Sequence, residues 1–187
     1  MESLNPQILI GVLVALAVVV IAFVLMQKRR TDELRGKFGP EYERLVQQHG
    51  DARHAESELA SRVDRVKQLH IKPITPEHRN RFAEAWRSDQ ARFVDDPKGA
   101  VVEADRLVAD LMQVRGYPVG DFEQRAADVS VDHPHVVQNY RVAHDIAVRE
   151  QRGEASTEDL RVAMVHYRAL FEDLLDSNEP EPREATR

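Results

Sequence analysis

The strongest pattern in the sequence is an apolar run that begins at Ile8 and ends at Met26, ILIGVLVALAVVVIAFVLM. These nineteen residues contain no charged residue and no proline. A helix of a soluble protein is apolar along one stripe, whereas this segment is apolar on every side. As a helix it would be ~28 Å long, about the thickness of the hydrocarbon core of a bilayer. The run therefore predicts a transmembrane anchor over residues 1–27.

The charges that flank this run predict its orientation. Lys28, Arg29 and Arg30 follow it directly, whereas the preceding segment, MESLNPQ, has no basic residue. Because cytoplasmic flanks collect Lys and Arg, we expect a single-pass protein of the cell membrane with its N-terminus outside and its C-terminal domain in the cytoplasm. The three cations are also expected to attract anionic lipid headgroups. The alternatives are a cleaved signal peptide, which normally has a basic leading segment, and a reversed, envelope-facing topology.

Two small residues in the run bear on self-association. Gly11 and Ala15 are four residues apart, a spacing that lets two helices approach closely in lipid. One such pair is also common in anchors that do not pair, so the spacing leaves both outcomes open.

A basic juxtamembrane segment, residues 28–39, is expected to end at Gly39-Pro40, and a charged, stalk-like helix at 40–72 follows. Its apolar seam has alternating spacings of four and three, typical of a coiled coil, but three of eight positions are polar. Two interpretations remain: the helix pairs with a second copy, or it packs against the distal domain. The seam positions are Leu45, His49, Ala52, Glu56, Leu59, Val63, Val66 and His70.

Residues 73–176 show helical periodicity in several short segments, separated by caps and turns. Thr75 and Asp96 each precede a proline and are expected to cap helices, and Ser156 with Asp159 resembles a capping box. No segment alternates apolar and polar residues as a strand would. The sequence thus predicts an all-α fold: an N-terminal transmembrane helix, a long juxtamembrane helix and a compact bundle of four or five helices. The polar tail, 177–187, is expected to be disordered.

Composition, net charge and the absence of known motifs exclude several classes of function for this chain. The chain has no cysteine, which excludes disulfides and thiolate chemistry. Its net charge is −6, and residues 75–175 hold 13 basic and 19 acidic residues. Because an acidic surface repels phosphate backbones, a nucleic-acid partner is not expected. No phosphate-binding glycine loop, zinc-protease helix or serine-hydrolase elbow is present, so we expect no enzymatic activity, no catalytic residue and no cofactor.

Histidines are the residues most suited to metal chemistry here. His133 and His135 flank a proline, and a metal site would also need His144 or His166 to converge on them. The simpler interpretation is that Asp132 caps a helix and its neighbours are solvated, so no metal site is predicted.

Trp86, the only tryptophan, is expected to pack in the core of the bundle.

The turn-rich loop RGYPVG, residues 115–120, is the best candidate surface for a partner or ligand. Arg115, Tyr117 and Pro118 would give it a shaped, exposed segment, and loops carry function more often than scaffolds do. The alternative is a tight connector between two helices.

Five short strings resemble an uncharacterised family of bacterial single-pass, membrane-anchored helical proteins: FGPEY at 38–42, FVDDP at 93–97, RGYP at 115–118, SVDHP at 130–134 and YRALF at 167–171. The resemblance covers most of the chain after the anchor. It implies a bacterial source and a membrane-tethered helical domain, and it supplies no activity or catalytic residue.

Together these observations predict a membrane-anchored helical adaptor or scaffold that binds the lipid bilayer and a protein partner or a second copy of itself. The competing hypothesis is a helical domain that binds a metal or ligand, or acts as an enzyme.

Overall fold

The computed structural model describes residues 6–176, with backbone alone for residues 6–10, 12 and 14. This described part is all-helical, as expected, with eight α-helices and no strand. The helices are α1 (Pro6–Phe38), α2 (Pro40–His49), α3 (Ala52–Lys67), α4 (Pro76–Arg92), α5 (Pro97–Arg115), α6 (Phe122–Asp132), α7 (Val137–Gln151) and α8 (Thr157–Asp176). The predicted disordered tail, 177–187, lies outside the described residues.

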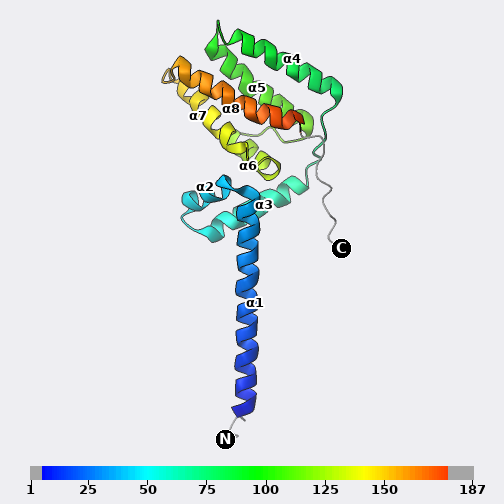
Figure 1. The fold of residues 1–187 in the computed structure, drawn as a ribbon, viewed down its shortest axis with the longest axis vertical. Helices are drawn as coiled ribbons and strands as arrows, with labels where there is room; N and C mark the ends of the chain where they lie inside the picture. The colour runs from blue at the N-terminus through cyan, green and yellow to red at the C-terminus, as the bar shows by residue number, and fades with distance from the viewer. Residues whose placement is uncertain (1–5, 177–187) are drawn as a thin grey trace.

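Helix α1 projects from the rest of the molecule as a long rod, with its N-terminal end far from the other helices (Figure 1). It continues without a break through the basic segment that follows Met26 and ends at Phe38. Gly39, with φ of 50°, turns the chain there, and Pro40 begins α2 as expected. Across the described residues, no helix combines the length and hydropathy needed to cross a membrane. The side chain of Ile8, where the predicted span begins, lies outside that description.

The single long helix expected over residues 40–72 is wrong, because α2 and α3 form a hairpin. Gly50 ends α2 in the left-handed conformation, with φ of 68°. Asp51 then caps α3 by accepting a hydrogen bond from the backbone N–H of Arg53. A residue without a side chain adopts this backbone at little cost, so Gly50 followed by an N-cap reverses the chain. The hairpin packs on α1 and α6, in agreement with the interpretation that this segment contacts the distal domain.

Five helices, α4–α8, form the predicted bundle, with α8 packed between α5 and α7. Thr75 and Asp96 cap α4 and α5 through the backbone N–H groups of His78 and Gly99. At the start of α8, the hydroxyl of Ser156 accepts from the N–H of Asp159, whose carboxylate accepts from the N–H of Ser156. These reciprocal bonds complete the capping box, with Asp in the position usual for Glu.

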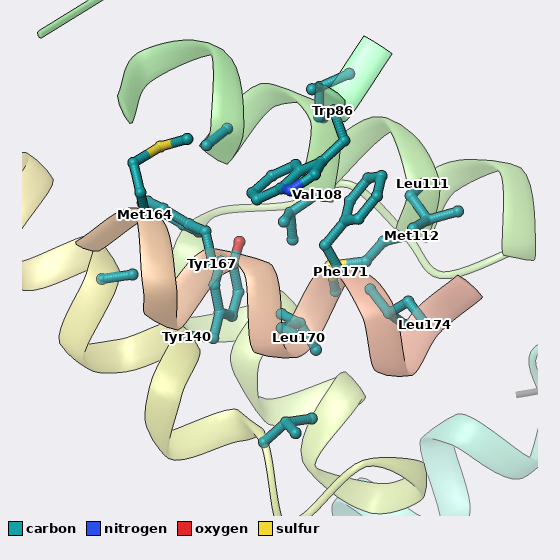
Figure 2. Packing of buried hydrophobic residues seen from close by; sticks show 14 of the residues in the cluster. Trp86, Val108, Leu111, Met112, Tyr140, Met164, Tyr167, Leu170, Phe171 and Leu174 are labelled. Atoms are coloured by element: carbon teal, nitrogen blue, oxygen red, sulfur yellow. The ribbon is translucent and has the colours of Figure 1, made fainter. Parts of the chain in front are cut away.

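The main core lies where α4, α5, α7 and α8 meet (Figure 2). Trp86 is buried as predicted and stacks on Phe171 with 4.5 Å between ring centroids. Tyr140 and Tyr167 are fully buried, and their rings meet edge to face. A second, smaller cluster joins α1, the α2–α3 hairpin and α6. Its buried members are Phe38, Tyr42, Leu45, Ala55, Leu59, Val66 and Val131.

Candidate functional site

A buried ionic network joins the α2–α3 hairpin to the bundle. Glu41, at the start of α2, has a side chain with no exposed area. Its carboxylate accepts hydrogen bonds from Arg44 on the same helix at 2.9 Å and from Arg62 on α3 at 2.8 Å. Arg141, which lies on α7 and is separated from Glu41 by 100 residues, donates to it at 3.0 Å. One carboxylate thus holds three helices together, and the term junction network denotes these four residues below.

Charge balance explains how Glu41 stays ionised inside the protein. Burial by itself raises the pKa of a carboxyl group, because it penalises the charged form. The hydrogen bonds and charges of Arg44, Arg141 and Arg62 outweigh that penalty and lower the pKa of Glu41 to about 2. Breaking such a pair from one side leaves buried charge without compensation, so the network favours one fixed arrangement of hairpin and bundle.

A second set of polar contacts joins α3 to α6. Asp128 on α6 is fully buried at its side chain and forms an ion pair of 2.7 Å with Arg65 on α3. Gln124 donates to the other carboxylate oxygen of Asp128 at 2.9 Å. The α3–α6 interface is therefore polar at its edge and apolar at Val131, which packs in the second cluster.

The contact between α1 and α3 depends on Glu56, one of the polar residues of the predicted seam. The Oε1 atom of Glu56 accepts from the hydroxyl of Thr31 at 2.7 Å and from the hydroxyl of Tyr42 at 3.1 Å. Leu34 and Phe38 of α1 pack against the second cluster beside this contact. A carboxylate at a seam position is tolerated here because two neighbouring helices supply its donors.

A groove of about 490 Å³ is lined by residues of α5 and α7 and by Arg92. Its walls combine Val101, Val102 and Ala147 with the polar side chains of Asp105 and His144. The charges of this groove are mixed and do not define one ligand.

His144 itself is held by packing. Its ring stacks on Phe122 at 3.6 Å between centroids. Burial lowers the pKa of His144, which favours the neutral imidazole.

The structure does not bring His144 or His166 to His133 and His135, as a metal site would have required. His133 and His135 both contact the carboxylate of Asp173 on α8, His135 at 2.9 Å. His166 instead forms a hydrogen bond of 3.0 Å with Asn139. Among the described side chains, no group of three or more His, Cys, Asp or Glu is arranged to hold a metal ion. Asp132, proposed as a helix cap, is the last residue of α6 and accepts from the hydroxyl of Tyr117 at 2.8 Å.

The loop at 115–120 is mainly a connector, and its expected exposure is wrong for Arg115 and Tyr117. Both side chains are 2% exposed. Arg115 donates to the backbone carbonyl of Leu174 at 3.0 Å. Because each of them forms a hydrogen bond inside the fold, Arg115 and Tyr117 fix the end of α5 against α8 and α6. Pro118 is exposed, so a partner surface at this loop would comprise residues 118–120 alone.

Asp89 was not singled out by the sequence, yet it is the most unusual carboxyl group of the bundle. It lies on α4, is 4% exposed, and neither of its carboxylate oxygens has a hydrogen-bond partner among the described residues. Burial, followed by the charge of Glu103, raises its pKa to about 6, and Arg92 opposes the rise. The sequence does contain a signal for the burial of Asp89. Asp89 follows Trp86 by three residues, so it lies on the same, buried face of α4.

The basic residues predicted to meet lipid headgroups lie on the free shaft of α1. Lys28, Arg29 and Arg30 are all exposed, and within the described residues none of them forms an ion pair.

Comparison with protein-family models found no match, and no curated protein or solved structure is detectably similar to the chain.

Proposed function

We propose that the protein is a non-catalytic, membrane-tethered scaffold, in which α1 anchors a rigid helical bundle that binds a protein partner. The observation that carries the proposal is the exposed apolar surface of α1. Leu16, Phe23 and Met26 are 60%, 61% and 71% exposed, and their neighbours along the shaft are similarly uncovered. A continuous apolar surface of this kind needs an apolar environment, and residues 8–26 match a bilayer in length.

The charges around α1 support an orientation with the bundle in the cytoplasm. Lys28, Arg29 and Arg30 directly follow the apolar run, whereas the seven residues before it, MESLNPQ, include no Lys or Arg. Moving three cations across a membrane is unfavourable, so they favour the cytoplasmic side.

The junction network supports a scaffold more than a flexible tether. Phe38 is fully buried in the second cluster, and Glu41 ties the hairpin to α7. The bundle is therefore held in one orientation relative to α1, and the position and direction of its surface are set by the anchor. A bundle surface held at a fixed position and direction relative to the membrane suits a protein partner that is itself at the membrane.

Membrane association and topology test the proposal directly. Extraction of membranes with alkaline carbonate should leave the full chain in the pellet, and deletion of residues 8–26 should release it. A reporter active only in the cytoplasm, fused after Arg187, should be active, and a reporter active only outside should be silent. Release of the full chain by carbonate would refute the anchor, and the opposite reporter pattern would refute the orientation.

The scaffold role needs a separate measurement. Site-specific crosslinking from the exposed face of the bundle in intact membranes should capture the same protein in repeated experiments. A variant with Arg141→Gln, which loosens the junction network, should lose that product while remaining in the membrane. Crosslinking that yields no specific product from any bundle surface would contradict a scaffold.

A further inference from the structure

The crossing of α1 and α3 fixes how close the domain comes to the end of the apolar run. The hydroxyl of Thr31 donates to Glu56 at 2.7 Å, and Tyr42 donates to the same carboxylate at 3.1 Å. Phe38, two turns above Thr31, is fully buried between the same elements. The first turns of α3 are therefore held beside the part of α1 that contains Thr31. Figure 1 shows α3 crossing α1 at the base of the domain.

This inference rests on the proposed anchor, from which a height above the bilayer follows. Thr31 is five residues beyond Met26, a rise of ~7.5 Å along the helix. The polar headgroup layer on each side of a bilayer is about 5–8 Å thick. With the apolar run in the hydrocarbon core, the start of α3 would lie at the outer edge of the headgroups.

Two exposed cations flank this crossing on the faces that form it. Lys28 precedes Thr31 by three residues on α1, and Arg53 precedes Glu56 by three residues on α3. Residues three apart on a helix share a face, so each cation lies one turn from the Thr31–Glu56 contact. Both side chains are exposed, and neither forms an ion pair with any described residue.

The acidic groups near the crossing do not neutralise these cations. Asp51 accepts from the backbone N–H of Arg53, and its carboxylate contacts the ring of His54 at 2.9 Å. Residues 27–37 of α1 contain five basic and two acidic residues, in a chain whose net charge is −6. Positive charge is thus gathered at the end of the domain that would face the membrane.

We propose that Lys28, Arg29, Arg30 and Arg53 form a headgroup-facing surface that binds the phosphate groups of anionic phospholipids. Arg53 extends this surface from the shaft of α1 to the domain itself. A guanidinium forms paired hydrogen bonds with phosphate, and an ammonium on the neighbouring helix adds a second positive charge. The surface would hold α3 against the bilayer and add lipid selectivity to the anchor.

The absence of cysteine allows a direct test, because one introduced cysteine labels one site. Ser57→Cys places a fluorophore on an exposed position of α3, four residues after Arg53, and Ser88→Cys places it on α4 at the far side of the domain. The full chain would be reconstituted into vesicles whose phosphatidylcholine or phosphatidylglycerol carries a quencher on its headgroup. Quenching should be strong at position 57 and weak at position 88. It should also be greater for the anionic lipid by at least about fivefold, because each basic residue near the surface favours anionic lipid by about that factor.

Two charge variants identify the residues responsible. Lys28→Gln with Arg53→Gln should lower the preference for the anionic lipid, with Arg29 and Arg30 still in place. The matched pair, Arg87→Gln with Arg152→Gln, removes two exposed cations from the bundle and should leave that preference unchanged.

Flotation of the vesicles separates failure of the anchor from failure of this inference. A chain that does not float with the vesicles refutes the anchor. A chain that floats but shows equal quenching at positions 57 and 88, or keeps its lipid preference undiminished after Lys28→Gln with Arg53→Gln, refutes the headgroup-facing surface and leaves the anchor intact.

Discussion

At the scale of single residues, Asp89 is expected to make the bundle less stable as the pH rises. Its pKa is about 6 in the folded protein, against an ordinary value of 3.8. Between these values the folded state binds more protons than the unfolded state, so the free energy of unfolding falls as pH increases. Stability should be highest near pH 4 and level off above about pH 7. Asp89→Asn, which stays neutral, should be more stable than the natural chain at pH 8 by about 3 kcal/mol.

Urea unfolding of the chain in detergent, followed by the fluorescence of Trp86 between pH 4 and 8, measures this effect. Asp95→Asn is the control, because Asp95 is an exposed carboxylate six residues away, in the turn between α4 and α5. An unchanged pH slope in Asp89→Asn would contradict the assignment.

Glu41 is the residue on which the junction network depends, and its loss should be costly. Glu41→Gln leaves Arg44, Arg62 and Arg141 without their shared carboxylate, and breaking a buried pair from one side costs about 3–5 kcal/mol. Glu43→Gln is the matched control, since Glu43 is half-exposed and pairs with Arg35 at 2.8 Å on the surface. Its loss should cost less than about 1 kcal/mol. Equal urea midpoints for the two variants at pH 7 would refute a structural role for the network.

At the scale of helices, two glycines test how the chain reverses and how the linker before α4 is held. Gly50 and Gly116 both have positive φ, 68° and 99°, but a Cβ on Gly50 would meet open space. A Cβ on Gly116 would lie 2.4 Å from the backbone carbonyl oxygen of His70. Gly50→Ala should therefore cost only the backbone strain, about 1 kcal/mol, whereas Gly116→Ala should cost about 2–4 kcal/mol because the linker must move. Thermal unfolding of both variants would show the difference, and similar losses would contradict it.

The helix boundaries also show which features of the fold can be predicted from the sequence and which cannot. Local signals were reliable: Gly39-Pro40, Thr75, Asp96 and the Ser156–Asp159 box all act as expected, because each depends on neighbours within a few residues. The break at Gly50 was missed, since the heptad-like seam continues across it and suggests one helix.

Long-range contacts could not be predicted from the pattern alone. Arg141 pairs with Glu41 across a helix interface, and nothing in the sequence identifies Glu41 as its partner. Tyr117 likewise resembled an exposed loop residue until the fold placed Asp132 beside its hydroxyl.

At the scale of the whole molecule, the two apolar clusters divide the chain unequally. Every buried member of the main core lies between Ile74 and Leu175, so the bundle contains its own core. The second cluster draws on α1, α2 and α3 but also needs Val131 from α6. The hairpin therefore depends on the bundle, whereas the bundle does not depend on the hairpin for its main core.

A fragment of residues 73–187 should accordingly fold on its own and unfold cooperatively in urea. It should be less stable than the bundle within the full chain, because Val131 becomes exposed and Asp128 loses its ion pair with Arg65. A fragment of residues 28–72 should remain largely unfolded alone, since the face of α3 that carries Leu59 and Val66 has no α6 to cover it. Circular dichroism of each fragment, and of the two mixed, measures both expectations, and mixing should restore helix to the shorter one. Cooperative unfolding of 28–72 alone would show that the hairpin folds without the bundle. Absence of cooperative unfolding for 73–187 would show that the bundle cannot fold without the hairpin.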